Sequence, residues 1–165
     1  MTLDYILSKR KKYKGVLVDT NLLLLLLVGL FDEKQIDTYK RINKYSTEDF
    51  NKLIFILKYF PHKFLITPNI LTEVCNLSEN FNSSNHNLFF KFLEDNINTW
   101  HEHIEKSLDL IKTNQEGFYK FGITDTSIID LAKQNTLIIT DDLKLYHFLA
   151  TKNLDVINYN HLRML

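Results

Sequence analysis

The chain has little cysteine and no excess of charge. Cys75 is the one cysteine among 165 residues, so no internal disulfide framework can form, and the composition suits a reducing compartment. The 20 basic side chains are matched by 20 acidic ones. Net charge therefore indicates no partner, and a nucleic acid would have to be bound by a local basic patch.

A long apolar run is also missing. The uncharged stretch from Leu22 to Phe31 begins with six leucines, yet it covers only about half of the roughly 20 residues that span a bilayer. A secretory signal fits poorly, because Asp19 and Asn21 interrupt the apolar region and no small-residue cleavage site follows. We expect a cytoplasmic protein with no membrane segment.

Short apolar runs alternate with helical patterns along the chain. Strands are predicted at 15–19, 64–67, 136–140 and 155–159. Helices are predicted directly after residue 19, twice within 32–60, and at 68–80, 88–100, 104–111, 123–135 and 141–153. This alternation predicts an α/β fold, a three-layer α/β/α sandwich around a mostly parallel sheet, in a single domain over 1–165. The helices within 32–60 would be an addition between the first two strands.

Polar residues and glycines indicate where helices begin. Thr20 or Asn21 can cap the leucine-rich helix, whose all-apolar surface predicts that it is surrounded by protein. Glycines at both ends of 117–122 predict a break, followed by a helix that Thr124 or Asp125 opens.

Acidic residues follow the predicted strands, where α/β sheets bind their ligands. They are Asp19, Glu73, Asp125, Asp141 and Asp142. Each alone could be a helix cap or a surface acid, but together they bring carboxylates from four segments to one edge. Converging carboxylates repel one another unless a cation neutralises them, and Mg²⁺ or Mn²⁺ prefers oxygen ligands.

Four segments resemble, in order, the motif blocks of the PIN domain family. They are "VLVDTN" at 16–21, "TPNILTEV" at 67–74, "GITDTSIIDLA" at 122–132 and "LIITDD" at 137–142. Any one block is weak, but four in order, each with its acid, are fairly specific. The resemblance runs from about Tyr13 to Tyr159 and implies a metal-dependent endoribonuclease with the sandwich fold.

The resemblance assigns catalysis and metal binding to four acids, namely Asp19, Glu73, Asp125 and Asp142. They would hold one or two Mg²⁺ or Mn²⁺ ions, with Asn21 and Thr140 in support. Asp141 occupies a position that varies in the family and is the second choice for the fourth acid. The family also implies an RNA substrate, a homodimer and, for many bacterial members, a toxin with an antitoxin partner. The alternative is a catalytically silent PIN-like module that binds RNA or protein.

Two features depart from the family pattern. The 32–60 segment makes the interval between the first two acids longer than in small bacterial PIN toxins. The neutral charge means that RNA must meet lysines on the added helices or a basic run in an N-terminal arm or helix at 1–12 and just beyond. That run comprises Lys9, Arg10, Lys11, Lys12 and Lys14, and it could equally be a solvated arm.

Other site types lack a residue that they need. A dinucleotide site needs a glycine-rich turn after the first strand, where leucines stand. A phosphatase resembling the haloacid dehalogenases needs an aspartate where Asn21 stands. His101 and His103 lie in a predicted helix, in which positions two apart face different sides, so zinc binding is not expected.

Overall fold

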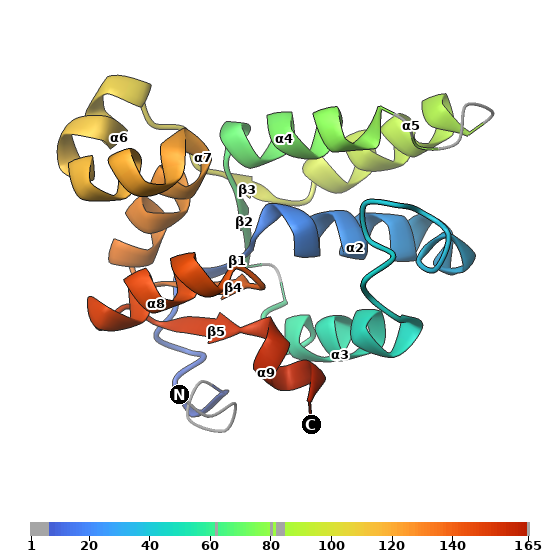
Figure 1. The fold of residues 1–165 in the computed structure, drawn as a ribbon, viewed down its shortest axis with the longest axis horizontal. Coiled ribbons are helices and arrows are strands. Elements are labelled where there is room, and N and C mark those ends of the chain that lie inside the picture. Colours follow the sequence, from blue (N-terminus) through green and yellow to red (C-terminus); the bar gives the residue numbers. More distant parts are fainter. Residues whose placement is uncertain (1–6, 62, 80, 82–84, 165) are drawn as a thin grey trace.

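A computed structural model describes residues 7–61, 63–79, 81 and 85–164 (Figure 1). Within this part, five parallel strands form one sheet in the order β3-β2-β1-β4-β5. The strands are β1 (Gly15–Val18), β2 (Phe64–Ile66), β3 (His101–Glu102), β4 (Thr136–Thr140) and β5 (Val156–Asn158). The prediction of an α/β fold around a parallel sheet is confirmed.

Helices cover both faces of the sheet. Figure 1 shows α2 (Thr20–Phe31), α3 (Thr47–Leu57), α4 (Pro68–Ser78) and α5 (His86–Ile97) on one side, and α6 (Ser107–Thr113), α7 (Gln115–Lys133) and α8 (Leu143–Thr151) on the other. Right-handed crossovers explain this division, because the chain moves along the sheet one way from β1 to β3 and the opposite way from β3 to β5. The result is the predicted three-layer sandwich.

The leucine-rich helix α2 lies in the core, as predicted. All six leucines from Leu22 to Leu27 are buried, and each contributes roughly 1.5–3 kcal/mol through the hydrophobic effect. The predicted caps are wrong: Asp19 caps α2, because its extended backbone lets its carboxylate accept from the backbone N–H of Thr20. Across the described residues, no helix combines the length and apolar content that a membrane crossing requires.

The added segment contains one α-helix instead of the two that were predicted. Helix α3 begins at a capping box, in which Ser46 and Asp49 bond to each other's backbone N–H. Before it, a short 3₁₀ helix (Glu33–Gln35) leads into turns. Ile36 and Ile42 are fully buried from these turns, so their spacing marks separate hydrophobic anchors rather than a helical stripe.

Other boundaries differ from the sequence prediction. Strand β3 and the short helix α9 (Tyr159–Arg163) were not predicted. The 117–122 break is confined to Gly122, whose φ of +82° kinks α7, whereas Gly117 lies inside the helix against Ile129. Of the predicted arm at 1–12, residues 1–6 lie outside the described part, and residues 9–12 form turns.

Candidate acidic site at the carboxyl edge of the sheet

The sheet has its topological switch point between β1 and β4. From β1 the chain continues to β2 on one side, while β4 and β5 lie on the other side. In such sheets a crevice opens beyond the carboxyl ends of the two strands at the switch. Asp19 follows β1 there, and Thr140 ends β4, with its hydroxyl donating to Asp19 Oδ2 at 2.5 Å.

Asp19 is a buried carboxylate held by neutral donors. Its side chain accepts from the Thr20 backbone N–H at 2.7 Å as well as from the Thr140 hydroxyl. Burial raises the pKa of Asp19 to about 6, the two hydrogen bonds oppose the rise, and the charges of Asp141 and Asp142 add to it. A nearby cation would stabilise the ionised form.

Glu73 reaches the same edge from α4. The Thr20 hydroxyl donates to Glu73 Oε2 at 3.0 Å, so Thr20 links Glu73 to Asp19 through its side chain and its backbone. Glu73 is exposed, so it carries none of the burial penalty that an inward-facing acid on this helix would carry. The sequence interpretation missed Thr20 in this role, although its position directly after Asp19 was the available signal.

Asp125 lies in α7 just after the kink at Gly122. Burial, and after it the charges of Asp19, Asp142 and Glu73, together raise the pKa of Asp125 to about 7. The four acids proposed from the sequence therefore lie within electrostatic reach of one another, although they come from four separate segments.

Two buried hydroxyls fix this part of α7. Ser127 shares a hydrogen bond of 2.9 Å with Thr67, which caps α4 directly after β2. Ser127 also donates to the Thr124 carbonyl at 2.6 Å, three residues back along the helix, and Asp125 lies between the two. The second helix of α7 is thus tied to the carboxyl end of β2, which sets the position of Asp125.

Asp142 caps α8 and also belongs to the acidic group. Its Oδ1 accepts from the backbone N–H groups of Lys144 and Leu145, at 2.6 and 3.0 Å. Its own N–H donates to the Thr140 hydroxyl, the same group that bonds to Asp19. The helix-cap role and the cluster role, considered as alternatives from the sequence, coexist in Asp19 and Asp142.

Asp141 is held by cationic and hydroxyl partners. Its side chain is 5% exposed, and Oδ2 accepts from Lys44 Nζ at 2.5 Å and from the Tyr45 hydroxyl at 2.6 Å. Burial raises the pKa of Asp141, but Lys44, Tyr45 and Asn21 outweigh burial and hold the pKa below its usual value. The structure therefore places Asn21 beside Asp141. The charge of Asp141 raises the pKa of Asp19, whereas the charge of Asp142 raises the pKa values of both Asp19 and Asp125.

The donor chemistry of the four acids fits a hard cation. They offer only carboxylate oxygens, the ligands that Mg²⁺ and Mn²⁺ prefer, and a cation would relieve the repulsion that raises the pKa values of Asp19 and Asp125. Among the described residues, no three His, Cys, Asp or Glu side chains are close enough to hold one metal ion as they stand. Asp19, Glu73, Asp125 and Asp142 thus form an electrostatic group rather than a closed coordination shell.

Residues 101–103 do not form the predicted helix: His101 lies in the two-residue strand β3, and His103 follows directly after it. The helical spacing argument used against zinc therefore does not apply to this pair. The two side chains nevertheless differ: His101 is exposed, whereas His103 Nε2 lies 3.5 Å from Asp130 Oδ2.

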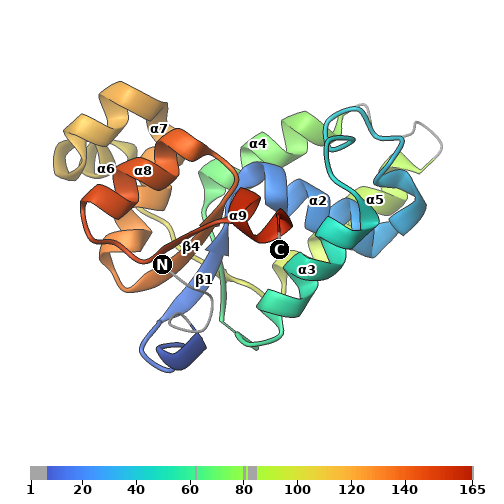
Figure 2. The ribbon, with the colours of Figure 1, turned by 60° about the horizontal axis from the view of Figure 1, so that its bottom comes forward.

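The basic run lies at the opposite end of the sheet. The Lys14 N–H donates to the carbonyl of Asn135, just before β4, and Gly15 pairs with Thr136. Figure 2 shows the N-terminal arm at one end of β1 and α2 starting at the other. At about 3.3 Å per residue, Lys14 and Asp19 are separated by about 15 Å.

Two groups of predicted site residues are thus separated in the structure. The four acids and Thr140 meet at the carboxyl edge, whereas the basic run from Lys9 to Lys14 lies at the amino edge.

Comparisons of the chain with known protein families, with curated proteins and with solved structures found no match.

Proposed function

We propose that the protein is a metal-dependent endoribonuclease whose acidic site hydrolyses RNA phosphodiester bonds. The observation that carries this proposal is the meeting of four acids from four segments, in which Thr20 links Asp19 to Glu73 and Thr140 links Asp19 to Asp142. Burial and the charges of Asp19, Asp142 and Glu73 raise the pKa of Asp125 to about 7, in agreement with this arrangement. Mutual repulsion destabilises the folded protein, and a divalent cation would offset that repulsion. The four sequence blocks that resemble PIN domains supply the same four acids independently.

The chain's own residues orient the acids. Thr140 holds Asp19 Oδ2 and the Asp142 backbone, while Thr20 holds Asp19 Oδ1 and Glu73. Asp19, Glu73, Asp125 and Asp142 would hold one or two Mg²⁺ or Mn²⁺ ions. Such an ion supplies Lewis acidity, which lowers the pKa of a bound water and stabilises charge on the phosphoryl oxygens.

The resemblance to PIN domains also supports proposals about context. A cytoplasmic location, a homodimer and a small antitoxin partner would follow if the chain is a bacterial toxin of that kind. Co-purification of a partner encoded by a neighbouring reading frame tests the antitoxin proposal directly.

The experiment measures cleavage of a labelled RNA by the purified protein with Mn²⁺ or Mg²⁺, and again with a chelator. Asp19→Asn removes one charge of the cluster while keeping the shape of the side chain. We expect cleavage to fall at least about a hundredfold, because charge stabilisation by a metal lowers the activation barrier by several kcal/mol. Asp109→Asn, an exposed acid in the first turn of α6, is the matched control and should cleave normally.

Equal cleavage by wild type and Asp19→Asn would overturn the proposal. RNA binding without metal-dependent cleavage would instead favour the catalytically silent binding module.

A further inference from the structure

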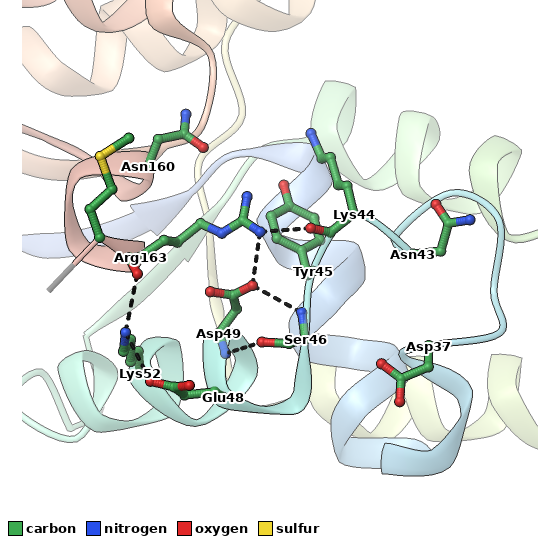
Figure 3. Close-up of a pocket in the computed structure, with 11 residues that line it drawn as sticks. Asp37, Asn43, Lys44, Tyr45, Ser46, Glu48, Asp49, Lys52, Asn160 and Arg163 are labelled. Carbon is green, nitrogen blue, oxygen red and sulfur yellow. Dashed lines mark hydrogen bonds and ion pairs between the residues drawn. The ribbon is translucent and has the colours of Figure 1, made fainter.

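A pocket of about 610 Å³ opens beside the acidic cluster, between the added 32–60 segment and α9 (Figure 3). Three cationic side chains line it, each from a different part of the chain: Lys44 from the loop before α3, Lys52 from α3 and Arg163 from α9. The pocket therefore exists only because the added segment packs against the end of the chain.

Residues that line the pocket contact Asp141, which lies next to the acidic cluster. Lys44 and Tyr45 both bond to Asp141 Oδ2, and Asn160 Nδ2 donates to the Asp141 carbonyl at 2.7 Å. Asp141 follows Thr140, which bonds to Asp19, and it precedes Asp142. Asp141 thus connects the pocket residues to Asp19 and Asp142.

Lys44 and Arg163 are positioned over one aromatic ring. Lys44 Nζ lies 4.9 Å and Arg163 Cζ 5.1 Å from the centre of the Tyr45 ring. Arg163 is anchored through Nη2, which bonds to the Lys44 carbonyl at 2.6 Å and to Asp49 Oδ2 at 3.0 Å (Figure 3). The Lys44 side chain is 50% exposed, so its ammonium group combines a fixed position with access to solvent.

Three acids, Asp37, Glu48 and Asp49, line the pocket beside the three cations, and the last two differ in how tightly they hold their partners. Asp49 is buried and bonds to Arg163 and to the Ser46 N–H, so it is part of the framework. Glu48 is 77% exposed and pairs with Lys52 at 3.1 Å across one helical turn. The Lys52 side chain is 28% exposed, and its Nζ also donates to the Arg163 carbonyl at 3.3 Å. Because Glu48 is largely exposed, the pair contributes little, and a phosphate could replace Glu48 as the partner of Lys52.

We propose that this pocket is a subsite for a phosphate group of the RNA strand, next to the phosphodiester bond that the acids cleave. Each of the three cations has a carboxylate partner, so the pocket carries no excess positive charge. Lys52, whose partner Glu48 is 77% exposed, is the cation that a flanking backbone phosphate can bind, while the acidic cluster would hold a metal at the scissile bond. The proposal rests on the proposed function. It assigns backbone binding to the added segment, since the basic run at the amino edge is about 15 Å from the acids.

Binding of a fluorescent 2′-O-methyl RNA oligonucleotide, measured by anisotropy with a chelator present, tests the subsite without cleavage. Lys52→Gln should weaken binding about threefold to tenfold and reduce the slope of log K against log salt by about 0.7, the loss of one phosphate contact. Glu48→Gln removes the competing carboxylate and should strengthen binding by a similar factor. The opposite directions exclude unfolding as the common cause.

Helix α5 offers matched controls. Lys91 pairs with Glu94 at 3.1 Å, also on a helix surface, and neither residue lines the pocket. Lys91→Gln and Glu94→Gln should leave the dissociation constant unchanged. Equal effects of the pocket and control variants, or no binding of the oligonucleotide at 50 mM salt, would overturn the subsite.

Two further measurements distinguish the possible outcomes. Lys52-dependent binding of inorganic phosphate without binding of the oligonucleotide would overturn the assignment to a nucleic acid. Metal-dependent cleavage lost in Asp19→Asn, together with unchanged binding by Lys52→Gln, would leave the proposed nuclease standing and remove the subsite alone. If the oligonucleotide binds with the expected pattern but no RNA is cleaved, the subsite stands and the proposed nuclease activity is overturned.

Discussion

Asp141 and Asp142 are neighbours in the chain, yet they belong to regions in which carboxylates are stabilised differently. Asp141 and the nearby Asp49 have cationic partners, Lys44 and Arg163. Asp142 faces the acidic cluster, where Asp19 is held by a hydroxyl and a backbone N–H and is repelled by other acids. Folding alone favours the paired arrangement. The unpaired cluster lowers stability, so binding of a ligand explains it better than folding does.

Of the three variants compared in this section, Asp19→Asn should have the largest effect on stability. The pKa of Asp19 is raised from 3.8 to about 6, so ionisation in the folded protein opposes folding by roughly 3 kcal/mol at neutral pH. After allowance for weakened hydrogen bonds, we expect the variant to be more stable than wild type by about 1–3 kcal/mol at pH 7 without metal. Denaturant unfolding with a chelator present measures the difference.

The pH dependence gives the sign of this effect. Below the unfolded pKa of about 3.8 both states are protonated, and the stabilisation from a raised pKa is fully present. It is lost as pH rises through about 6, so the advantage of Asp19→Asn should be absent near pH 3.5 and complete by pH 7. Mn²⁺ should stabilise wild type and not the variant. An advantage independent of pH would show that Asp19 is not the destabilising group.

Tyr45→Phe tests the paired region and should have a moderate effect. It removes one donor from the buried carboxylate of Asp141 and keeps the ring beneath Lys44 and Arg163. We expect a loss of about 1–2 kcal/mol at pH 7, measured by denaturant unfolding. Because the pKa of Asp141 is lowered, the loss should shrink as pH falls below the usual range for aspartate. A stabilised variant would contradict the contrast between the two regions.

The smallest effect should come from the amino edge. The double variant Lys11→Gln, Lys12→Gln removes two exposed charges of the basic run. The run is about 15 Å from the acids, beyond the Debye length of about 8 Å at physiological salt, so RNA cleavage should change less than about twofold. A larger loss than that of Lys52→Gln in the same assay would place the RNA on the basic run instead.

Local patterns predicted much of the architecture. The buried leucines of α2 and the start of α4 at residue 68 depend on near neighbours, and each lies where its pattern indicated. The stretch from Ile36 to Ile42 misled, because residues anchored separately from turns produced a helix-like spacing. Strand β3 is two residues long and has no apolar run, so its pairing with β2 leaves no trace in the sequence.

The sequence by itself determined the alternation of strands and helices, and therefore which acids follow which strands. Hydrophobic spacing and turn residues act over a few positions, and they set these features locally. Only the tertiary structure decided that Asp142 acts on both Asp19 and Asp125, whereas Asp141, which also acts on Asp19, pairs with Lys44 and Tyr45. It also decided that the basic run lies at the far edge. Those outcomes depend on contacts between residues about a hundred positions apart, where burial and charge act through space rather than along the chain.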